Sequence, residues 1–287
     1  MNTLTHEKRC AVIRCLVDGC SIRATTRMTG VAKNTIQKLT RDLGRPVLEY
    51  HDHVVRQVKS QRVQCDEVWC FCYAKDKNLP DEMRGQPGVG SIWTWTALDA
   101  DSKLMIGWRL GARDFANAYA FIGDVKARLA NRVQLTTDGN RVYLDAVLDH
   151  FAEIDFAMLQ KLYGPGEEGP EARYSPAKCN GTKKTTIMGH PDPAHVSTSY
   201  VERQNLNIRM QNRRYTRLTN AFSKKAEMLA YSVAITFFYH NFVRIHQTLG
   251  VTPAMKAKIA DHKWSIEEMV NLLPEVLYPT EKKGNSN

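Results

Sequence analysis

Three acidic residues stand in surroundings where a carboxylate could do chemistry. Asp66 lies inside one hydrophobic run, Asp138 ends a second, and Glu202 follows a stretch rich in Gly, Pro, Lys and Ser. A carboxylate among strand residues is costly to bury unless it has a partner or a metal ion. Carboxylates brought together from separate elements supply the oxygen ligands that Mg²⁺ prefers, and two such ions can clamp the attacking and leaving oxygens of a phosphodiester displacement.

Each acid also has a structural interpretation. Asp138 precedes Gly139 and could simply form a turn. Ser199 stands three residues before Glu202, so the two could form a capping box at the start of a helix. Glu67 follows Asp66 directly and would point to the other side of a strand, so we expect it not to be a ligand.

The elements that must position these acids follow from the hydrophobic period. Alternation predicts strands over 63–73, 91–99, 104–110, 132–137 and 154–162, and helical spacing predicts helices over 114–129 and 142–151. Three strands with short connections suggest an antiparallel meander, and the rest completes a mixed five-stranded sheet with helices packed on it. The first and fourth strands could be neighbours, which would bring Asp66 close to Asp138. No period is evident from about 164 to 198, so we expect a long insertion there.

The N-terminal residues predict a small all-α unit. Helical patterns cover 6–17 and 33–43, with a short helical segment between them, and we expect Gly44 and Pro46 to close the third helix. Two short helices joined by a tight turn fit a helix-turn-helix. The side chains that the third helix would offer to a DNA major groove are Lys33, Asn34, Gln37, Lys38 and Arg41. A generic three-helix bundle with a solvated basic face is the alternative.

Charge favours a polyanionic partner. Forty Lys and Arg residues against 30 Asp and Glu residues give a formal net charge of +10. This excess suits nucleic acid, although ribosomal or membrane-surface binding would fit equally well. The seven Cys residues lack a regular disulfide spacing, and the longest uncharged stretch, 228–243, is too short and too polar for a membrane span. We therefore expect a cytoplasmic protein that does not enter a membrane.

A run of basic residues follows Glu202 with no acidic residue to balance it. Its members are Arg203, Arg209, Arg213, Arg214, Arg217, Lys224 and Lys225. Such a run suits contacts with phosphates, and Tyr215 within it could stack on an unpaired base. A solvated basic helix face is the simpler explanation.

Several motifs together resemble one known family. They lie at 64–69, 137–139, 197–205, 213–225, 239–249 and 252–254. In combination they are similar to bacterial and archaeal insertion-sequence transposases of the insertion-sequence-one group, over roughly residues 61–256. The resemblance implies an α/β, RNase H-like catalytic domain of the DDE superfamily. The expected organisation is a helix-turn-helix domain at 1–50, a linker at 51–60, the catalytic domain at 61–250 with its insertion at about 164–198, and a tail at 251–287.

The resemblance also implies a reaction. Asp66, Asp138 and Glu202 would hold two Mg²⁺ or Mn²⁺ ions while water attacks at the transposon end and frees a 3′-hydroxyl, which then attacks target DNA. Asn205 lies one helical turn after Glu202, and Arg203 or Arg209 could hold a phosphate. Arg244 and His246 fall where a helix ends; they could contact DNA, or could simply close the helix.

The implied partners are double-stranded DNA, as terminal inverted repeats and as target, and a second copy of the chain. The expected location is the cytoplasm of a prokaryotic cell, on the nucleoid when bound to DNA. Three alternatives stay open: a DNA-binding regulator that does not cut, an RNase H-like nuclease that cuts without joining, and an RNA- or ribosome-binding protein.

Overall fold

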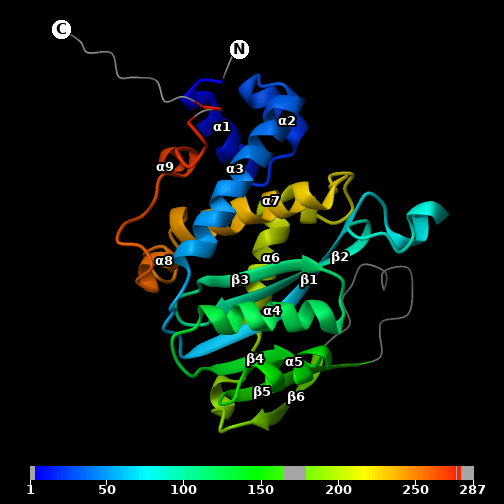
Figure 1. The fold of residues 1–287 in the computed structure, drawn as a ribbon, viewed down its shortest axis with the longest axis vertical. Helices are drawn as coiled ribbons and strands as arrows, with labels where there is room; N and C mark the ends of the chain where they lie inside the picture. The colour runs from blue at the N-terminus through cyan, green and yellow to red at the C-terminus, as the bar shows by residue number, and fades with distance from the viewer. Residues whose placement is uncertain (1–3, 165–178, 276, 279–287) are drawn as a thin grey trace.

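A mixed β-sheet occupies the lower half of the molecule in Figure 1, and the N-terminal helices stand above it. The computed structural model describes residues 4–164, 179–275, 277 and 278 of the chain. The strands are β1 (Arg62–Cys72), β2 (Gly90–Asp99), β3 (Met105–Gly111), β4 (Gln134–Asp138), β5 (Asp155–Tyr163) and β6 (Cys179–Met188). The longer helices are α1 (His6–Val17), α2 (Ile22–Thr29), α3 (Lys33–Val54), α4 (Phe115–Arg128), α5 (Val142–His150), α6 (Ser199–Gln211) and α7 (Ala226–Phe238).

The sheet has the strand order β3-β2-β1-β4-β5-β6. The first three strands form an antiparallel meander, β4 and β5 run parallel to β1, and β6 returns antiparallel to β5. The predicted mixed α/β class is confirmed, and the arrangement is RNase H-like. The parallel pairing of β1 with β4 confirms that the first and fourth strands are neighbours.

The expected strand number was wrong because β6 falls inside the predicted insertion. Most β6 side chains are exposed at the edge of the sheet. An edge strand in solvent shows no alternation between buried and exposed positions, so its sequence carries no period to detect. Residues 165–178 of the predicted insertion lie outside the described residues.

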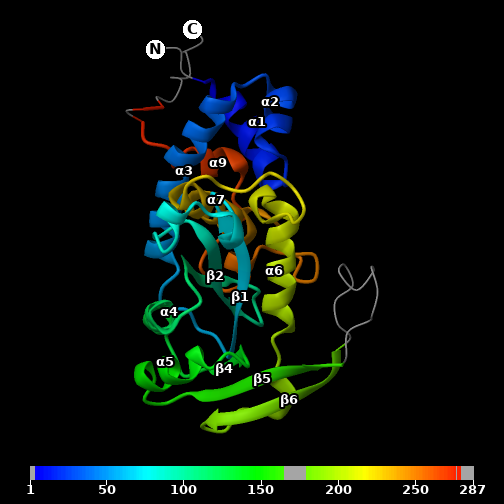
Figure 2. The ribbon, with the colours of Figure 1, turned by 90° about the vertical axis from the view of Figure 1, so that its right-hand side faces the viewer.

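Helices cover both faces of the sheet, as Figure 2 shows with α4 and α5 on one side and α6 on the other. Side chains alternate along β1, and this alternation decides which face of the sheet each side chain lies on. Val63 and Cys65 pack in the same core as Phe121 of α4, whereas Val68 packs with Val201 of α6. Because both faces of β1 are covered, Glu67 is buried and Asp66 is partly buried.

The three N-terminal helices are present, but the predicted end of the third was wrong. Instead of closing at Gly44 and Pro46, α3 runs through both and ends at Val54, within the predicted linker. A Cβ atom at position 44 would come within 2.3 Å of the Cβ atom of Tyr231 on α7. Gly44 therefore permits a close crossing of two helices, and this packing outweighs the cost of a proline inside α3.

The end of the chain packs against its beginning. After α7 come a π-helical turn, Tyr239–Val243, and two short helices, α8 (Pro253–Lys256) and α9 (Ile266–Val270). Residues of α9 share a core with α1, and the Tyr278 hydroxyl donates a hydrogen bond of 2.8 Å to Asp42 on α3. The predicted tail is thus folded in its described part, while residues 279–287 lie outside the description. Among the helices described, none is long and apolar enough to cross a membrane.

Candidate active site

Asp66 and Asp138 lie side by side on neighbouring parallel strands. Cys65 of β1 is paired in register with Thr137 of β4, so the next residue along each strand is one of the two acids. Carboxylate oxygens of Asp66, Glu67 and Asp138 all lie within 4.8 Å of one another. The sheet thus brings two of the three predicted acids together and adds a third acid that was not expected.

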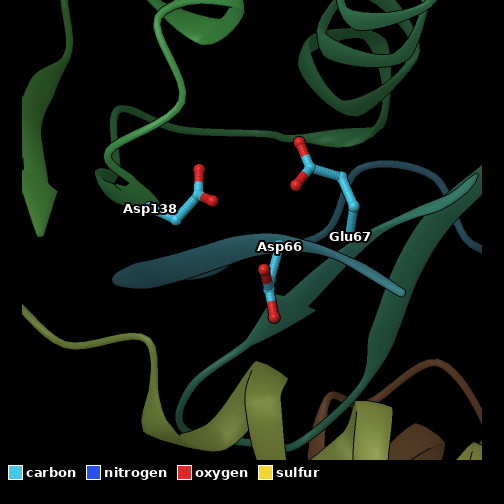
Figure 3. Close-up of side chains that lie close together, drawn as sticks. All are labelled: Asp66, Glu67 and Asp138. Atoms are coloured by element: carbon cyan, nitrogen blue, oxygen red, sulfur yellow. The ribbon is translucent and has the colours of Figure 1, made fainter. Parts of the chain in front are cut away.

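Glu67 points to the opposite side of β1 from Asp66, as predicted. In Figure 3, Asp66 points toward the yellow-green helix α6, whereas Glu67 and Asp138 point away from it. Even so, the Glu67 carboxylate reaches Asp138, because Asp138 is the last residue of β4 and starts a turn: its Oδ1 accepts a hydrogen bond of 3.0 Å from the Asn140 backbone N–H. The turn interpretation of Asp138 is therefore correct and does not exclude a place in the site.

Two polar side chains hold this outer pair of acids. The Arg113 guanidinium donates to Glu67 at 3.2 Å and to Asp138 at 3.3 Å, and the Asn140 amide donates to Glu67 at 3.1 Å. The Glu67 side chain is only 1% exposed, so Arg113 supplies the counter-charge that its burial requires. Neither Arg113 nor Asn140 was predicted, because their loops carry no period that would place them beside β1.

Asp66 is held by α6. The Asn205 amide donates a hydrogen bond of 2.9 Å to the Asp66 carboxylate, and Thr96 of β2 donates at 3.2 Å to the Asn205 amide oxygen. Asn205 was predicted to contact DNA, yet it is buried and its amide is used inside the protein. The spacing of one helical turn from Glu202 still indicated the correct face of Asn205, since this face of α6 meets the sheet.

Glu202 lies in the first turn of α6, as predicted, but the capping-box alternative was wrong. Ser199 does not cap the helix; the Thr198 hydroxyl donates to Glu202 at 2.6 Å, and the Lys161 ammonium of β5 pairs with the other carboxylate oxygen. The Glu202 carboxylate is a third exposed, and it is not among the described acids whose oxygens lie within 4.8 Å of one another. Lys161 was not predicted, since nothing in its strand marks it.

Gln64 caps α6 instead. Its side-chain oxygen accepts the backbone N–H groups of Tyr200 at 2.9 Å and Val201 at 3.1 Å. Gln64 stands two residues before Asp66 and so shares its face of β1. A second polar residue on the buried face of a strand was a signal in the sequence that could have been used.

Burial and mutual repulsion perturb the acids. Burial raises the pKa of Asp66 to about 6, and the charge of Asp138 adds to the shift. Burial likewise raises the pKa of Glu67 to about 7, again with a contribution from Asp138, and burial raises the pKa of Asp138. The Glu202 charge raises the pKa values of both aspartates further, which puts Glu202 within electrostatic reach of them. An all-oxygen donor set that resists ionisation without a cation fits a hard divalent metal ion.

The predicted DNA-contacting residues separate into two groups. The exposed group consists of Lys33, Asn34, Lys38, Arg41, Arg203, Arg217, Lys224, Lys225 and Arg244. The partly buried group consists of Gln37, Arg209, Arg213, Arg214 and His246. Arg214, for example, donates to the Ser223 hydroxyl at 2.7 Å, and burial lowers the pKa values of Arg209 and Arg214.

The predicted stacking role of Tyr215 was wrong. Its ring is buried, and its hydroxyl forms a hydrogen bond of 2.6 Å with Thr94 of β2. A base could not reach this ring without unfolding the segment that follows α6. The aromatic residue in the basic run anchors that segment to the sheet.

Comparison with known proteins gives matches only among solved structures. The chain is similar to the piggyBac transposase in a synaptic complex with hairpin DNA, over 95% of this chain and 70% of that chain, at 11% sequence identity and a TM-score of 0.39. It is also similar to the Mos1 mariner paired-end complex with Mn, over 48% of this chain and 54% of that chain, at 13% identity and a TM-score of 0.22. The chain thus spans about half the length of that mariner chain. No family model and no curated protein matches it.

Proposed function

We propose that this chain is a DNA transposase, which cuts phosphodiester bonds at the ends of a mobile element and joins the freed 3′-hydroxyls to target DNA. The observation that carries the proposal is the pair of partly buried carboxylates, Asp66 and Asp138, on neighbouring parallel strands. Glu202 lies on the helix that covers Asp66, one turn before Asn205. The proposed ligands thus come from three separate elements, β1, β4 and α6.

In this proposal Asp66, Asp138 and Glu202 hold two Mg²⁺ or Mn²⁺ ions. When bound, such ions polarise the phosphate and stabilise the attacking and leaving oxygens. The protein's own groups fix the ligands: Asn205 orients Asp66, and Arg113 positions Asp138. Cutting transfers the phosphoryl group to water, and joining transfers a target phosphoryl group to the 3′-hydroxyl oxygen with release of a target 3′-hydroxyl.

The remaining parts of the proposal concern DNA. Residues 1–50 would act as a helix-turn-helix unit that reads the terminal inverted repeats, with Lys33, Asn34, Gln37, Lys38 and Arg41 of α3 near the major groove. The exposed cations Arg203, Arg217 and Arg244 would add phosphate contacts. Because two ends must be cut in concert, the active form would contain at least two copies, in the cytoplasm of a prokaryotic cell.

The test is strand cleavage and joining on a labelled duplex that carries the terminal repeat of the element encoding this chain. With Mg²⁺ or Mn²⁺ the wild type should cut and join, and Asp66→Asn should lose at least about 10³-fold of that activity, because Asn keeps the shape but is a poor metal ligand. Asp66→Asn should still bind the duplex. Equal activity in the two proteins would refute the assignment of the site.

A second candidate is an RNase H-like nuclease, which would cut the duplex but leave no joined product. Specific binding of the repeat without metal-dependent cutting would instead indicate a DNA-binding regulator. Glu202→Gln separates a ligand from a structural residue, since Gln can still accept the Thr198 hydrogen bond. Retained cutting in Glu202→Gln would remove Glu202 from the proposed ligand set.

A further inference from the structure

A cleft separates the N-terminal helices from the segment that joins α6 to α7. Its volume is about 790 Å³, and its walls come from α2 and α3 on one side and from residues 212–228 on the other. The two walls are far apart in the sequence, but the segments next to them pack closely, since a Cβ atom at Gly19 would come within 2.4 Å of the Met210 carbonyl oxygen. In Figure 2 the upper end of α6 lies below α1 and α2, which places this cleft above the sheet.

Positive charge dominates both walls. Each wall contributes four basic side chains. Arg23 and Lys33 are among those on the first wall, and Lys224 and Lys225 are among those on the second. Glu227 is the acidic residue that lines the cleft with them. The Glu227 carboxylate accepts a hydrogen bond of 3.0 Å from the Tyr231 hydroxyl. A concave surface with eight cations and one acid concentrates a positive potential and favours a polyanion.

Most of these cations have no carboxylate partner. Lys38 and Arg41 share Asp42, but no ion pair involves Arg23, Lys33, Arg213, Arg214, Lys224 or Lys225 within the part of the chain that the structure describes. Lys224 instead lies over the rings of Tyr73 and Phe222, at 5.6 and 5.9 Å. The exposed members of this set, Arg23, Lys33, Lys224 and Lys225, therefore keep their charge available for a ligand.

Two helix N-termini add to the positive potential of the cleft. α3 starts at Lys33 after Ala32, and α7 starts at Ala226 after Lys225; neither capping residue provides a side-chain hydrogen bond. The first backbone N–H groups of both helices are thus not bound by a cap, and the helix dipoles have their positive ends here. The absent cap at Ala32, which weakens α3 by itself, suits an anion at this position.

The cleft is connected to the acidic site by α6. Glu202 lies in the first turn of α6, and Arg213 follows its last turn, which at 1.5 Å per residue separates the two by about 16 Å. One DNA strand advances about 3.4 Å per nucleotide along the helix axis, so this span corresponds to about five nucleotides. A backbone held in the cleft could therefore continue to Asp66 and Asp138 on the same protein surface.

We infer that the cleft is a binding site for the phosphodiester backbone of double-stranded DNA, gripped by both walls, which holds the duplex a few nucleotides from the acidic site. The inference rests on the proposed function for the identity of the ligand as DNA. It goes beyond that function in assigning one composite site to two segments that are separate in sequence. The cations contact phosphates, which carry no sequence information, so the reading of base sequence is left to Asn34 and Gln37 of the first wall.

The test measures binding of the full-length protein to a fluorescent 40-base-pair duplex of mixed sequence, in EDTA and at several salt concentrations. Arg23→Gln/Lys33→Gln removes two charges from the first wall, and Lys224→Gln/Lys225→Gln removes two from the second. Each pair should weaken binding about 10-fold at 0.15 M salt and make the slope of log K against log salt shallower by about two. The matched control is Lys256→Gln/Lys263→Gln, two exposed lysines outside the cleft, which should leave binding within about twofold of the wild type.

Wild-type affinity in both wall variants would overturn the inference, as would a loss no larger than that of the control. Tighter binding of an RNA duplex of equal length at matched salt would overturn the assignment to DNA. Because the assay contains no metal, its outcome does not depend on cutting. An inactive Asp66 site with a functional cleft, or the reverse, would therefore be recognised.

Discussion

The acidic site and the basic cleft carry opposite charge and are built in opposite ways. Asp66, Glu67 and Asp138 are withdrawn from solvent and restrained by hydrogen bonds from Arg113, Asn140 and Asn205. The cleft has mostly exposed cations without counter-ions. Burial of the carboxylates lowers the stability of the folded protein, whereas the solvated cations change it little. The two regions should therefore respond differently to mutation, pH and metal.

The largest expected effect comes from breaking the crossing of α3 and α7, two helices that line the basic cleft. Gly44→Ala places a methyl group against Tyr231, where α3 crosses α7 and where the neighbouring atom is a Cβ that cannot swing away. Overpacking of this kind should cost about 3 kcal/mol of unfolding free energy, a fall in Tm of several degrees. Thermal unfolding measures it, and binding of DNA in the cleft should weaken as α3 shifts.

Gly181→Ala is the matched control. Gly181 lies on the exposed strand β6, with nothing within 4 Å of an added Cβ atom and no unusual backbone angle. This variant should unfold within about 0.5 kcal/mol of the wild type. An equal fall in Tm for the two variants would mean that Gly44 is tolerant and that the helix crossing is not tight.

The second expected effect is a pH dependence of stability that arises from the acidic site. Asp66 and Glu67 have folded-state pKa values of about 6 and about 7, above their ordinary values of 3.8 and 4.5. A raised pKa in the folded state means that the metal-free protein is stabilised below the ordinary value and loses that stability as the pH rises through 6 to 7. Burial lowers the pKa of His51 to about 3 and that of His240 to about 4, so these two residues act in the opposite direction and add stability as the pH rises toward 6.5. We therefore expect the loss due to the two acids, on the order of 2 kcal/mol between pH 5 and pH 8, to appear as the difference between the wild type and Asp66→Asn/Glu67→Gln in denaturant unfolding in EDTA.

Divalent metal and two substitutions test whether ionisation of Asp66 and Glu67 causes this loss of stability. Mn²⁺ should restore stability at pH 8, because metal binds the ionised carboxylates. Asp66→Asn should reduce both the pH-dependent loss and the Mn²⁺ effect. Glu67→Gln should reduce the pH-dependent loss and retain the Mn²⁺ effect if Glu67 is not a ligand. An identical pH dependence of stability in the metal-free wild type and in Asp66→Asn/Glu67→Gln would contradict the burial of these acids.

The two regions also differ in how far sequence could predict them. Strand register is set by alternation, so the neighbouring positions of Asp66 and Asp138 followed from the predicted order of strands. The place of Glu202 in the first turn of a helix was also predictable from the local pattern. These features are local or depend on one pairing, which is why a single sequence sufficed.

The features that sequence could not give depend on packing between distant segments. The continuation of α3 through Pro46 is decided by its contact with α7, and β6 has no burial period because it lies at an edge. Tyr215 looked available to a base because its buried contact, Thr94, is 121 residues away. The partners of the acids, Arg113 and Lys161, come from a loop and a strand end whose positions depend on the whole sheet.

The smallest effect concerns Lys161, the cation that pairs with Glu202. Its ammonium occupies one oxygen of Glu202, and the charge of Asp66 also favours its protonated form, which raises the pKa of Lys161. A divalent ion must share or displace this positive charge. Lys161→Met should therefore tighten Mn²⁺ binding about fivefold, a modest gain because the pair is a third exposed and screened by water.

Calorimetric titration of Mn²⁺ measures this gain without relying on catalysis. Lys183→Met, an exposed lysine on β6 with no ion pair among the described residues, controls for loss of a positive charge at the same edge of the sheet. If Lys161→Met weakens Mn²⁺ binding while the control does not, Lys161 positions Glu202 rather than competing for it. The acidic site would then depend on Lys161 to position one of its carboxylates, whereas most cations of the basic cleft have no carboxylate partner among the described residues.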